Sequence, residues 1–327
     1  MLARLERELP RGDWAYEPKW DGFRCLVFRG GDDIVLQSRN GRALTRYFPE
    51  VVAALQAVTG DAVLDGELLL DAADDFPSLL ARIHPAASRV RLLSTQTPAR
   101  FVAFDCLALG PRIAMSEPFA TRRTLLEQLL AAAPDRVQPT PLTTDRDEAQ
   151  QWFDHPQAGW DGVVAKQLGC PYTPGARTMR KVKPQRSADC VVAGVRPGAA
   201  GPVSSLLLGL WTPDGTLHHP GVVSSPPRAV KTQLAEELPA LQVPLETHPW
   251  RGGFGLEGGT TGRLKGAGGR WVPGMTQDWL PIAPRLVAEV GYDRLDGLRF
   301  RHPARFRHWR PDRDPATCLV DQLVVGR

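Results

Sequence analysis

Short apolar runs separated by turn-forming residues dominate the first half of the chain. Two such runs, Cys25–Phe28 and Ile34–Leu36, are joined by Arg-Gly-Gly-Asp-Asp and predict a β-hairpin. Apolar residues spaced three or four apart predict helices over Phe48–Val58 and Thr121–Ala133. Further strands are predicted at Ala62–Leu70, Phe101–Leu107, Gly162–Lys166 and Arg180–Lys183.

The pattern changes after Pro184, where short strands alternate with Gly/Pro turns around one predicted helix, Pro227–Leu241. The predicted strands are Cys190–Val195, Leu206–Trp211, Gly221–Val223, Leu286–Gly291 and Leu298–Arg301. This pattern is typical of a small barrel such as an OB-fold. A domain boundary is predicted near Gln185–Ala188, which gives an α+β domain over residues 1–186 and a β-barrel domain over 187–327. The glycine-rich, basic segment Arg251–Gly274 is predicted to be a mobile loop.

Composition indicates an ordinary globular protein. The chain has 327 residues, 43% hydrophobic and 23% charged, which suggests about two domains. No apolar run approaches the roughly 18 residues of a membrane helix, and the charged N-terminus does not resemble a signal peptide. The five cysteines are scattered and form no C-x-x-C pair, which argues against a zinc site. We therefore expect no membrane association and a cytoplasmic location.

Basic residues are clustered, although the net charge is only +4. One cluster comprises Arg177, Arg180, Lys181, Lys183 and Arg186. The other comprises Arg299, Arg301, Arg305, Arg307, Arg310 and Arg313. His302, Phe306, His308 and Trp309 are interleaved with the second, a pattern that favours phosphate contacts beside stacking surfaces. Two solvated faces are the alternative interpretation.

Lys19 is the principal candidate nucleophile. It lies in Glu17-Pro18-Lys19-Trp20-Asp21-Gly22-Phe23-Arg24, a dense mixture of charged and bulky residues. A lysine amine attacks phosphorus or carbonyl carbon only when it is deprotonated, which a neighbouring cation, a metal or burial promotes. The alternative is a surface Lys–Asp pair on a turn.

Further short motifs follow Lys19 in order along the chain. They are Ser38-Arg39-Asn40-Gly41, Leu64-Asp65-Gly66-Glu67-Leu68, Phe101-Val102-Ala103-Phe104-Asp105, Asp161-Gly162-Val163-Val164-Ala165-Lys166, Lys181-Val182-Lys183-Pro184 and the C-terminal Arg305–Arg313. The ordered series resembles the covalent nucleotidyltransferase superfamily of ATP-dependent DNA ligases, RNA ligases and mRNA-capping enzymes. The resemblance covers nearly the whole chain and implies a nucleotidyltransferase (adenylation) domain of antiparallel sheets and helices followed by an OB-fold domain.

Several longer stretches resemble the small actinobacterial DNA ligase C group of repair enzymes. They are Tyr16–Arg24, Arg46–Glu50, Arg82–Pro85, Ala188–Gly194, Ser205–Leu210 and Trp309–Pro315. This resemblance implies ATP and Mg²⁺ or Mn²⁺ as cofactors and nicked duplex DNA as the partner, with other repair proteins as further partners. It also implies a monomer in the bacterial cytosol, associated with the nucleoid.

The resemblance implies three phosphoryl transfers. The Lys19 amine takes AMP from ATP, AMP passes to a 5′-phosphate at a nick, and a 3′-hydroxyl then displaces it. Such reactions need positioning and cations near the phosphates, and Lys181 and Lys183 are the implied cations. Glu67 and Asp161 are the implied metal ligands, because Mg²⁺ takes one or two carboxylates besides substrate oxygens. Superfamily members more often have glutamate at the position of Asp161.

The resemblance also implies the nucleotide contacts. Phe104 would stack on adenine, with a buried core aromatic as the alternative. Glu17 would recognise the adenine edge, and Glu67 would also lie near the ribose. Further implied contacts to ribose, phosphate or base are Arg24, Arg39, Lys166 and Arg177. Arg310, Asp312 and Arg313 resemble the superfamily's closing motif, which orients pyrophosphate; the alternative is that these arginines bind only the DNA backbone.

Three other functions remain open at this stage. An RNA ligase or capping guanylyltransferase shares the lysyl-nucleotide chemistry, but the longer stretches favour a DNA ligase. An NAD-dependent ligase is disfavoured because that family has a zinc-binding cysteine cluster. A non-catalytic nucleic-acid-binding protein on a ligase fold is disfavoured because Lys19, Glu67, Lys181 and Lys183 are all present.

Overall fold

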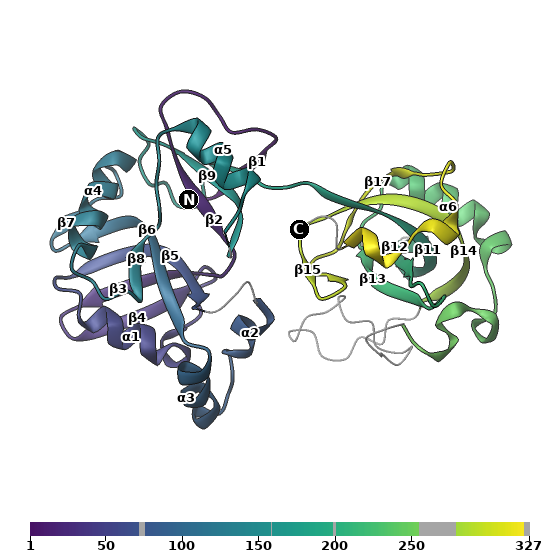
Figure 1. Cartoon of the computed structure of the whole chain (residues 1–327), viewed down its shortest axis with the longest axis horizontal. Helices are drawn as coiled ribbons and strands as arrows, with labels where there is room; N and C mark the ends of the chain where they lie inside the picture. The colour runs from purple at the N-terminus through teal and green to yellow at the C-terminus, as the bar shows by residue number, and fades with distance from the viewer. Residues whose placement is uncertain (72–75, 158, 199–200, 255–278, 324–327) are drawn as a thin grey trace. The chain divides into compact units, whose positions relative to one another are not determined.

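A computed structural model describes residues 1–327 except 72–75, 158, 199–200, 255–278 and 324–327. The chain divides into two compact units, Met1–Pro184 and Gln185–Arg327 (Figure 1). This division lies beside the predicted boundary between residues 186 and 187. Most of the predicted loop Arg251–Gly274 lies outside the described residues, and its first residues end a short 3-10 helix, η3 (Pro249–Gly252).

Two β-sheets form the framework of the first unit. One sheet has the order β1-β10-β9-β2, with β1 Ala3–Glu6, β10 Met179–Val182, β9 Trp160–Gln167 and β2 Trp14–Trp20. The other has the order β4-β3-β5-β6-β7, with β8 beside β6. Its strands are β4 Asp33–Ser38, β3 Phe23–Gly30, β5 Ala62–Leu70, β6 Ala99–Leu109, β7 Arg112–Ile113 and β8 Val137–Pro139. The predicted hairpin is the β3–β4 pair.

The helices of this unit cover the second sheet or flank the first. They are η1 Thr45–Tyr47, α1 Pro49–Gln56, α2 Phe76–Ala81, α3 Ala87–Gln96, α4 Phe119–Leu130 and α5 Arg146–Asp154. The two predicted helices are confirmed as α1 and α4, and α4 packs against β6 and β8 (Figure 1). α2, α3 and α5 were not predicted. α5 begins at an Asp145 cap, whose carboxylate accepts from the backbone N–H groups of Asp147 and Glu148.

Not all pairings are antiparallel, contrary to the expectation of antiparallel sheets. β1 pairs in parallel with β10, and β8 pairs in parallel with β6. Neighbouring strands in the sequence form antiparallel hairpins, whereas a parallel partner must arrive by a longer crossover. β1 and β10 lie at opposite ends of the sequence of this unit, so no hairpin pattern in the sequence could predict that they pair.

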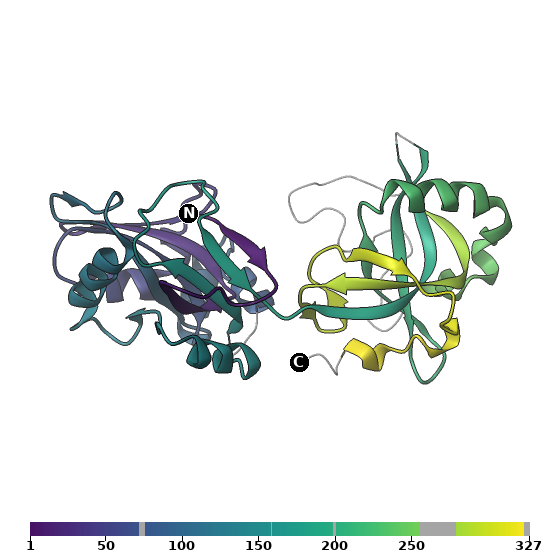
Figure 2. The same ribbon diagram turned by 90° about the horizontal axis from the view of Figure 1, so that it is seen from above.

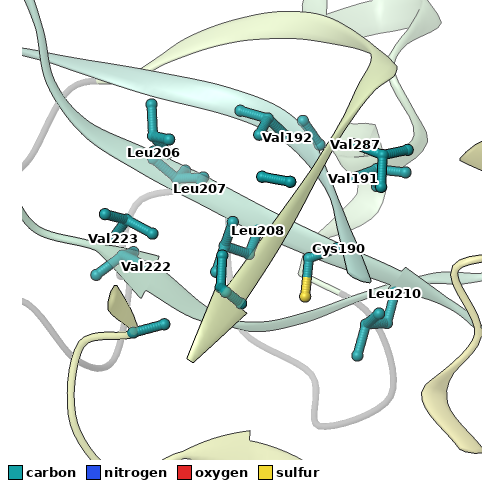
Figure 3. Packing of buried hydrophobic residues seen from close by; sticks show 14 of the residues in the cluster. Cys190, Val191, Val192, Leu206, Leu207, Leu208, Leu210, Val222, Val223 and Val287 are labelled. Carbon is teal, nitrogen blue, oxygen red and sulfur yellow. The ribbon is translucent and has the colours of Figure 1, made fainter. Parts of the chain in front are cut away.

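The second unit is a five-stranded sheet of order β13-β12-β11-β14-β17, curled around an apolar core (Figures 2 and 3). Its strands are β11 Arg186–Gly198, β12 Gly201–Trp211, β13 Leu217–Val223, β14 Leu280–Tyr292, β17 Arg305–Trp309 and the small pair β15 Leu295–Asp296 and β16 Arg299–Phe300. The helical segments are α6 Arg228–Leu241, η2 Leu245–Thr247, η3, η4 Pro315–Thr317 and η5 Val320–Leu323. The predicted barrel with one α-helix is therefore present among the described residues.

The core of each unit has a distinct composition. In the barrel it combines aliphatic residues, of which Val191, Val192, Leu206, Leu207 and Leu208 are fully buried (Figure 3), with a group of aromatic side chains. In the first unit two buried arginine–carboxylate pairs accompany the apolar side chains: Arg122 with Asp105 at 2.7 Å and Arg82 with Glu50 at 2.7 Å. Among the described residues, no helix is long and apolar enough to cross a membrane.

A buried histidine lies among the aromatic side chains of the barrel. His219 is fully buried, and its ring centroid lies 5.2 Å from that of Trp250 and 5.3 Å from that of Phe254. Its Nδ1 lies 2.8 Å from the carbonyl oxygen of Leu208, and its Nε2 has no partner among the described residues. The neutral ring with a proton on Nδ1 suits this position. Burial lowers the pKa of His219 to about 3.

Acidification should destabilise the barrel through His219. Its pKa is lower in the folded than in the unfolded state, so the stabilisation is complete above about pH 6.5 and falls as the unfolded chain takes up a proton. Because of His219, we expect the unfolding free energy to fall by roughly 2 kcal/mol between pH 7.5 and pH 5. Urea unfolding followed by tryptophan fluorescence measures this loss. A His219→Phe variant should show a pH dependence shallower by that amount; equal slopes would contradict the assignment.

Candidate active site

The nucleophile candidate lies near the end of β2, the edge strand of its sheet. β2 pairs antiparallel with β9, and Glu17 is opposite Val164. Lys19 Nζ donates to Asp161 Oδ2 at 2.8 Å across this pair. The Lys19 side chain is about one-fifth exposed, whereas Asp161 is buried. Lys19 therefore contacts a carboxylate 142 positions away in sequence.

Glu67 provides a second carboxylate close to Lys19. It lies on β5 opposite Arg24 of β3, and its Oε1 accepts from the backbone N–H of Gly22 at 3.1 Å. Loss of hydration within the protein raises the pKa of Glu67 to about 8, and the positive charges of Lys19 and Arg24 partly oppose this rise. The two predicted metal ligands thus flank the same lysine.

The base-binding candidates gather around Glu17, two residues before Lys19 on β2. Lys166 Nζ lies 2.8 Å from Glu17 Oε2 and donates to the carbonyl oxygen of Phe104 at 2.7 Å. The same ammonium lies 4.8 Å from the centroid of the Phe104 ring. Phe104 is half-buried, and its role as a stacking surface stays a prediction. Burial raises the pKa of Glu17, and Lys166 and Arg123 oppose that shift.

Arg24 is held in place by carboxylate and phenol groups. It forms a two-pronged ion pair with Asp65, with Nη2–Oδ2 at 2.6 Å and Nε–Oδ1 at 3.0 Å. The Tyr172 hydroxyl donates to the same carboxylate at 2.8 Å. The Arg24 guanidinium carbon also lies 5.6 Å from the centroid of the Phe104 ring. The charge of Arg24 is thus paired with the carboxylate of Asp65.

The two predicted phosphate-binding lysines lie on or just after β10, the strand that pairs with β9. Lys181 lies on β10 opposite Val164, and Lys183 follows the end of that strand. Gly162 allows this approach, because a Cβ there would lie 2.1 Å from the carbonyl oxygen of Val182 and 2.9 Å from Lys183 Cα. Gly162 also has φ +118°, which side-chain-bearing residues rarely adopt.

Two predicted contacts are not brought to this group. Arg39 is exposed on the turn after β4, and Arg177 is exposed before β10. Lys19, Glu17, Glu67, Phe104 and Asp161 form the compact set. The roles of Arg39 and Arg177 therefore stay predictions.

The predicted closing motif belongs to the second unit and forms an ion-pair network there. Arg310 Nη1 lies 3.0 Å from Asp189 Oδ2, and Arg310 Nη2 lies 2.8 Å from Asp312 Oδ2. Arg313 Nε lies 3.7 Å from the same Asp189 carboxylate. The Asp312 side chain is about two-thirds exposed, so the network lies at the surface of its unit. Hydrogen bonding to Arg310 lowers the pKa of Asp312 to about 2.

Several residues that support the site were not singled out from the sequence. Asp65 lies within a quoted motif, and Asp189 lies within a stretch that resembles the ligases, so a signal existed for both. Tyr172 and Arg123 belong to no quoted motif. Their roles depend on contacts between distant segments, such as Tyr172 with Asp65 and Arg123 with Glu17.

The arrangement of carboxylates suits one loosely held divalent cation. Within the described ranges, no group of three or more His, Cys, Asp or Glu side chains is placed to hold a metal by itself. Glu67 and Asp161 provide two hard oxygen ligands close to Lys19, and Mg²⁺ completes its shell with water and substrate oxygens. The residues present therefore fit an open site for Mg²⁺ or Mn²⁺ better than a closed structural metal site.

Comparison with known families assigns this architecture. Residues 2–183 match the family model of the ATP dependent DNA ligase domain, and residues 199–313 match that of the ATP dependent DNA ligase C terminal region. The two-sheet unit followed by a barrel thus belongs to the covalent nucleotidyltransferase class, with an OB-fold as its second domain, which confirms the predicted fold. More particularly, the chain belongs to the ATP-dependent DNA ligase family and is an enzyme of that family.

Curated relatives give a more detailed comparison. The chain is 46% identical over 330 residues to DNA ligase C2 of Mycolicibacterium smegmatis, covering 99% of this chain and 93% of that protein. It is also 46% identical over 333 residues to DNA ligase C of Mycobacterium tuberculosis, covering 99% and 92%. These matches confirm the resemblance to the actinobacterial DNA ligase C group.

Solved structures share the fold at lower sequence identity. A structure of a Lig E DNA ligase has a TM-score of 0.57 at 16% identity, covering 94% of this chain and 98% of that one. That likeness concerns the fold alone.

Gly162 should be intolerant of a side chain. Gly162→Ala places a Cβ against the Val182 carbonyl at a left-handed backbone position, so we expect a loss of at least about 2 kcal/mol of unfolding free energy. Gly169→Ala is the matched control, because a Cβ there meets no atom within 4 Å. Thermal and urea unfolding of both variants measure the difference. Equal stability of the two variants would show that β9 and β10 need no close approach here.

Proposed function

We propose that this ligase seals nicks between a 5′-phosphate and a 3′-hydroxyl in duplex DNA, through lysyl-AMP and DNA-adenylate intermediates. The observation that carries the proposal is the position of Lys19. Its amine lies 2.8 Å from Asp161, with Glu67 nearby and Glu17 two residues away on the same strand. A repair role and action as a monomer are parts of the same proposal, supported by similarity to the DNA ligase C group.

In the first step the amine of Lys19 attacks the α-phosphorus of ATP, and pyrophosphate leaves. Nζ must first release Asp161 and be free of its proton, since only the neutral amine is nucleophilic. Lys181 and Lys183 offset negative charge on the phosphates, because catalysis of phosphoryl transfer consists mainly of positioning and charge stabilisation. The product is a phosphoramidate between Nζ and AMP.

Glu67 and Asp161 are the proposed ligands of Mg²⁺ or Mn²⁺. When bound, such an ion neutralises phosphate charge and fixes the phosphate oxygens. The two carboxylates orient around Lys19 through Gly22 N–H and the lysine amine itself. Because Asp161 has a shorter side chain than glutamate, its carboxylate stays close to β9.

The base is proposed to stack on Phe104, with Glu17 at its edge and Lys166 beside both. The half-buried ring of Phe104 and the buried carboxylate of Glu17 support this orientation. Arg24 is proposed to contact ribose or phosphate from its fixed position beside Phe104. Arg39 and Arg177, which are exposed, are proposed to reach the nucleotide or the DNA when these are bound.

In the second step a 5′-phosphate oxygen at the nick attacks the α-phosphorus of lysyl-AMP, and the Lys19 amine leaves. In the third step the 3′-hydroxyl oxygen attacks the 5′-phosphorus, and AMP leaves with the electrons of the broken bond. Each step exchanges one bond to phosphorus for another, so Lys19 is regenerated. The basic residues of both units are proposed to hold the duplex through its phosphates.

Replacement of Lys19 tests the nucleophile. Lys19→Arg keeps a cation opposite Asp161 but stays protonated, so it should form no adenylate. Incubation with ATP and Mg²⁺, followed by intact-mass and peptide mass spectrometry, should place one AMP on Lys19 of the wild type. Lys231→Arg on α6 is the control and should be adenylylated normally. AMP on any other residue would contradict the assignment.

The closing motif should act in the first step alone. Arg310→Ala with Asp312→Ala should slow lysyl-AMP formation by roughly 10²–10³, by analogy with the loss of one preorganised charge at a reacting group. Sealing of a nick that already carries 5′-AMP should change far less. Two single-turnover rates, one with ATP and one with pre-adenylylated nicked DNA, provide the comparison.

Arg307→Ala is a matched control for that experiment. Arg307 is another surface arginine of β17 and pairs with Glu289 at 2.8 Å rather than with Asp189. Its loss should leave the rate of lysyl-AMP formation nearly unchanged. If the Arg310/Asp312 variant loses both rates equally, these residues bind DNA or maintain the fold and do not orient pyrophosphate.

A further inference from the structure

Arg123 on α4 lies close to Glu17 of β2, although it belongs to none of the motifs found in the sequence. Its Nε lies 2.7 Å from Glu127 Oε1, and its Nη2 donates to the carbonyl oxygen of Thr140 at 2.8 Å. The residue is buried to about nine-tenths. These two contacts leave Nη1, which points to Glu17 Oε1 at 3.8 Å.

This 3.8 Å gap separates two buried polar atoms that have no hydrogen-bond partner among the described residues, Glu17 Oε1 and Arg123 Nη1. An N–H···O hydrogen bond requires about 2.7–3.2 Å, so the two charges face each other without bonding. Buried polar atoms without a hydrogen-bond partner are costly and uncommon in native proteins. A ligand with one donor and one acceptor side by side would satisfy both.

We propose that Arg123 is a specificity-determining residue that, together with Glu17, distinguishes adenine from guanine. Arg123 Nη1 donates to a ring nitrogen of adenine, and Glu17 Oε1 accepts from the 6-amino group. This inference rests on the proposed adenylylation of Lys19, because it concerns the base of the same nucleotide.

The hydrogen-bonding pattern of the two purines supports the assignment. Adenine has a 6-amino donor beside a ring-nitrogen acceptor on both of its polar edges, N1 and N7. Guanine has the O6 acceptor at the corresponding position. Guanine O6 would meet the Glu17 carboxylate, so two acceptors would face each other. The pair of Arg123 and Glu17 is therefore complementary to adenine and mismatched to guanine.

The location also fits the base. Glu17 Oε2 is held by Lys166, and Lys166 lies against the Phe104 ring, which is the proposed stacking surface. Thr140, whose carbonyl oxygen binds Arg123, also accepts a hydrogen bond through Oγ1 from the indole N–H of Trp20 at 2.8 Å. Trp20 directly follows Lys19 in the chain. Glu17 Oε1 thus lies on the strand that carries Lys19, and Lys166 links Glu17 to the proposed stacking ring.

Both side chains are fixed before any base arrives. Glu17 is oriented by Lys166, and Arg123 by Glu127 and Thr140. Such preorganised donors and acceptors give specificity, because a wrong partner leaves buried groups unpaired. A lysine in place of Arg123 would lack the planar fork that makes these contacts at once.

Nucleotide analogues test the contact in the unmodified enzyme. Rates of lysyl-AMP formation are measured with ATP, 1-deaza-ATP, 7-deaza-ATP and purine riboside triphosphate, which lack N1, N7 and the 6-amino group respectively. We expect one of the two deaza analogues to lose roughly 10- to 100-fold in kcat/KM, the typical effect of removing one hydrogen bond to a charged group. Purine riboside triphosphate should lose a similar factor, and GTP at least about 100-fold.

Variants then assign the effect to Arg123. Arg123→Met should lose a similar factor with ATP and become indifferent to the sensitive deaza analogue, as in a double-mutant cycle. Arg112→Met is the matched control, because Arg112 is a half-exposed arginine that pairs with Glu117, and its loss should keep the discrimination. If Arg123→Met does not fold, the analogue series with wild type decides the question.

Different results would contradict the Arg123 contact and the adenylylation of Lys19. If the wild type forms lysyl-AMP equally well from ATP and both deaza analogues, the contact from Arg123 is wrong while adenylylation stands. If Arg123→Met retains the full penalty for the sensitive analogue, another group contacts that nitrogen. If no lysyl-AMP forms from ATP, the proposed function itself fails and this inference falls with it.

Discussion

Charges withdrawn from water must be paired, and this requirement determines the architecture of the first unit. Asp65, Asp105, Glu17 and Asp161 are all buried, and each contacts a cation contributed by a different segment of the chain. Replacing a buried pair as a whole by apolar groups is often tolerated, whereas removing one partner leaves an uncompensated charge and is strongly destabilising. The pairs therefore restrain the register of the strands and position the site at the same time.

Strand geometry converts these pairs into a site. Residues two apart on a strand share a face, so β2 presents Glu17 and Lys19 together. On the other sheet, the pairing of Arg24 with Glu67 places β3 beside β5, and Asp65 binds Arg24 from the same strand as Glu67. Gly162 lets the end of β10 approach β9 closely, which places the backbone of Lys183 beside Gly162. Backbone positions thus matter as much as the charged groups.

Sequence patterns were informative where they were local and failed where contacts were distant. α1 and α4 show helical spacing of apolar residues, and the hairpin β3–β4 has a turn between two apolar runs. α3 lacked this signal, since only Val90 and Leu93 are buried on it. The parallel pairings could not be predicted, because β1 and β10 come from opposite ends of the unit.

The same distinction applies to the candidate site. Motif residues such as Lys19, Glu67 and Asp161 were identified because they occur in recognisable short sequences, and the structure brings them together. Arg123 and Tyr172 are bound to the site by contacts between segments. Nothing in their local sequence distinguishes Arg123 from the neighbouring Arg122, whose guanidinium instead pairs with Asp105 in the core. Only the fold separates Arg122, which pairs with Asp105, from Arg123, which faces Glu17.

The two units use ion pairs of different strength, and this difference suits different tasks. Arg24 is bound to a fully buried carboxylate and a phenol, so its orientation is fixed whether or not a nucleotide is present. Arg310 pairs instead with the exposed Asp312 and the partly buried Asp189. Exposed ion pairs contribute little to stability because water and salt screen them. Arg310 can therefore exchange its carboxylate partners for other anions at small cost, which suits the role in one step that we propose for it.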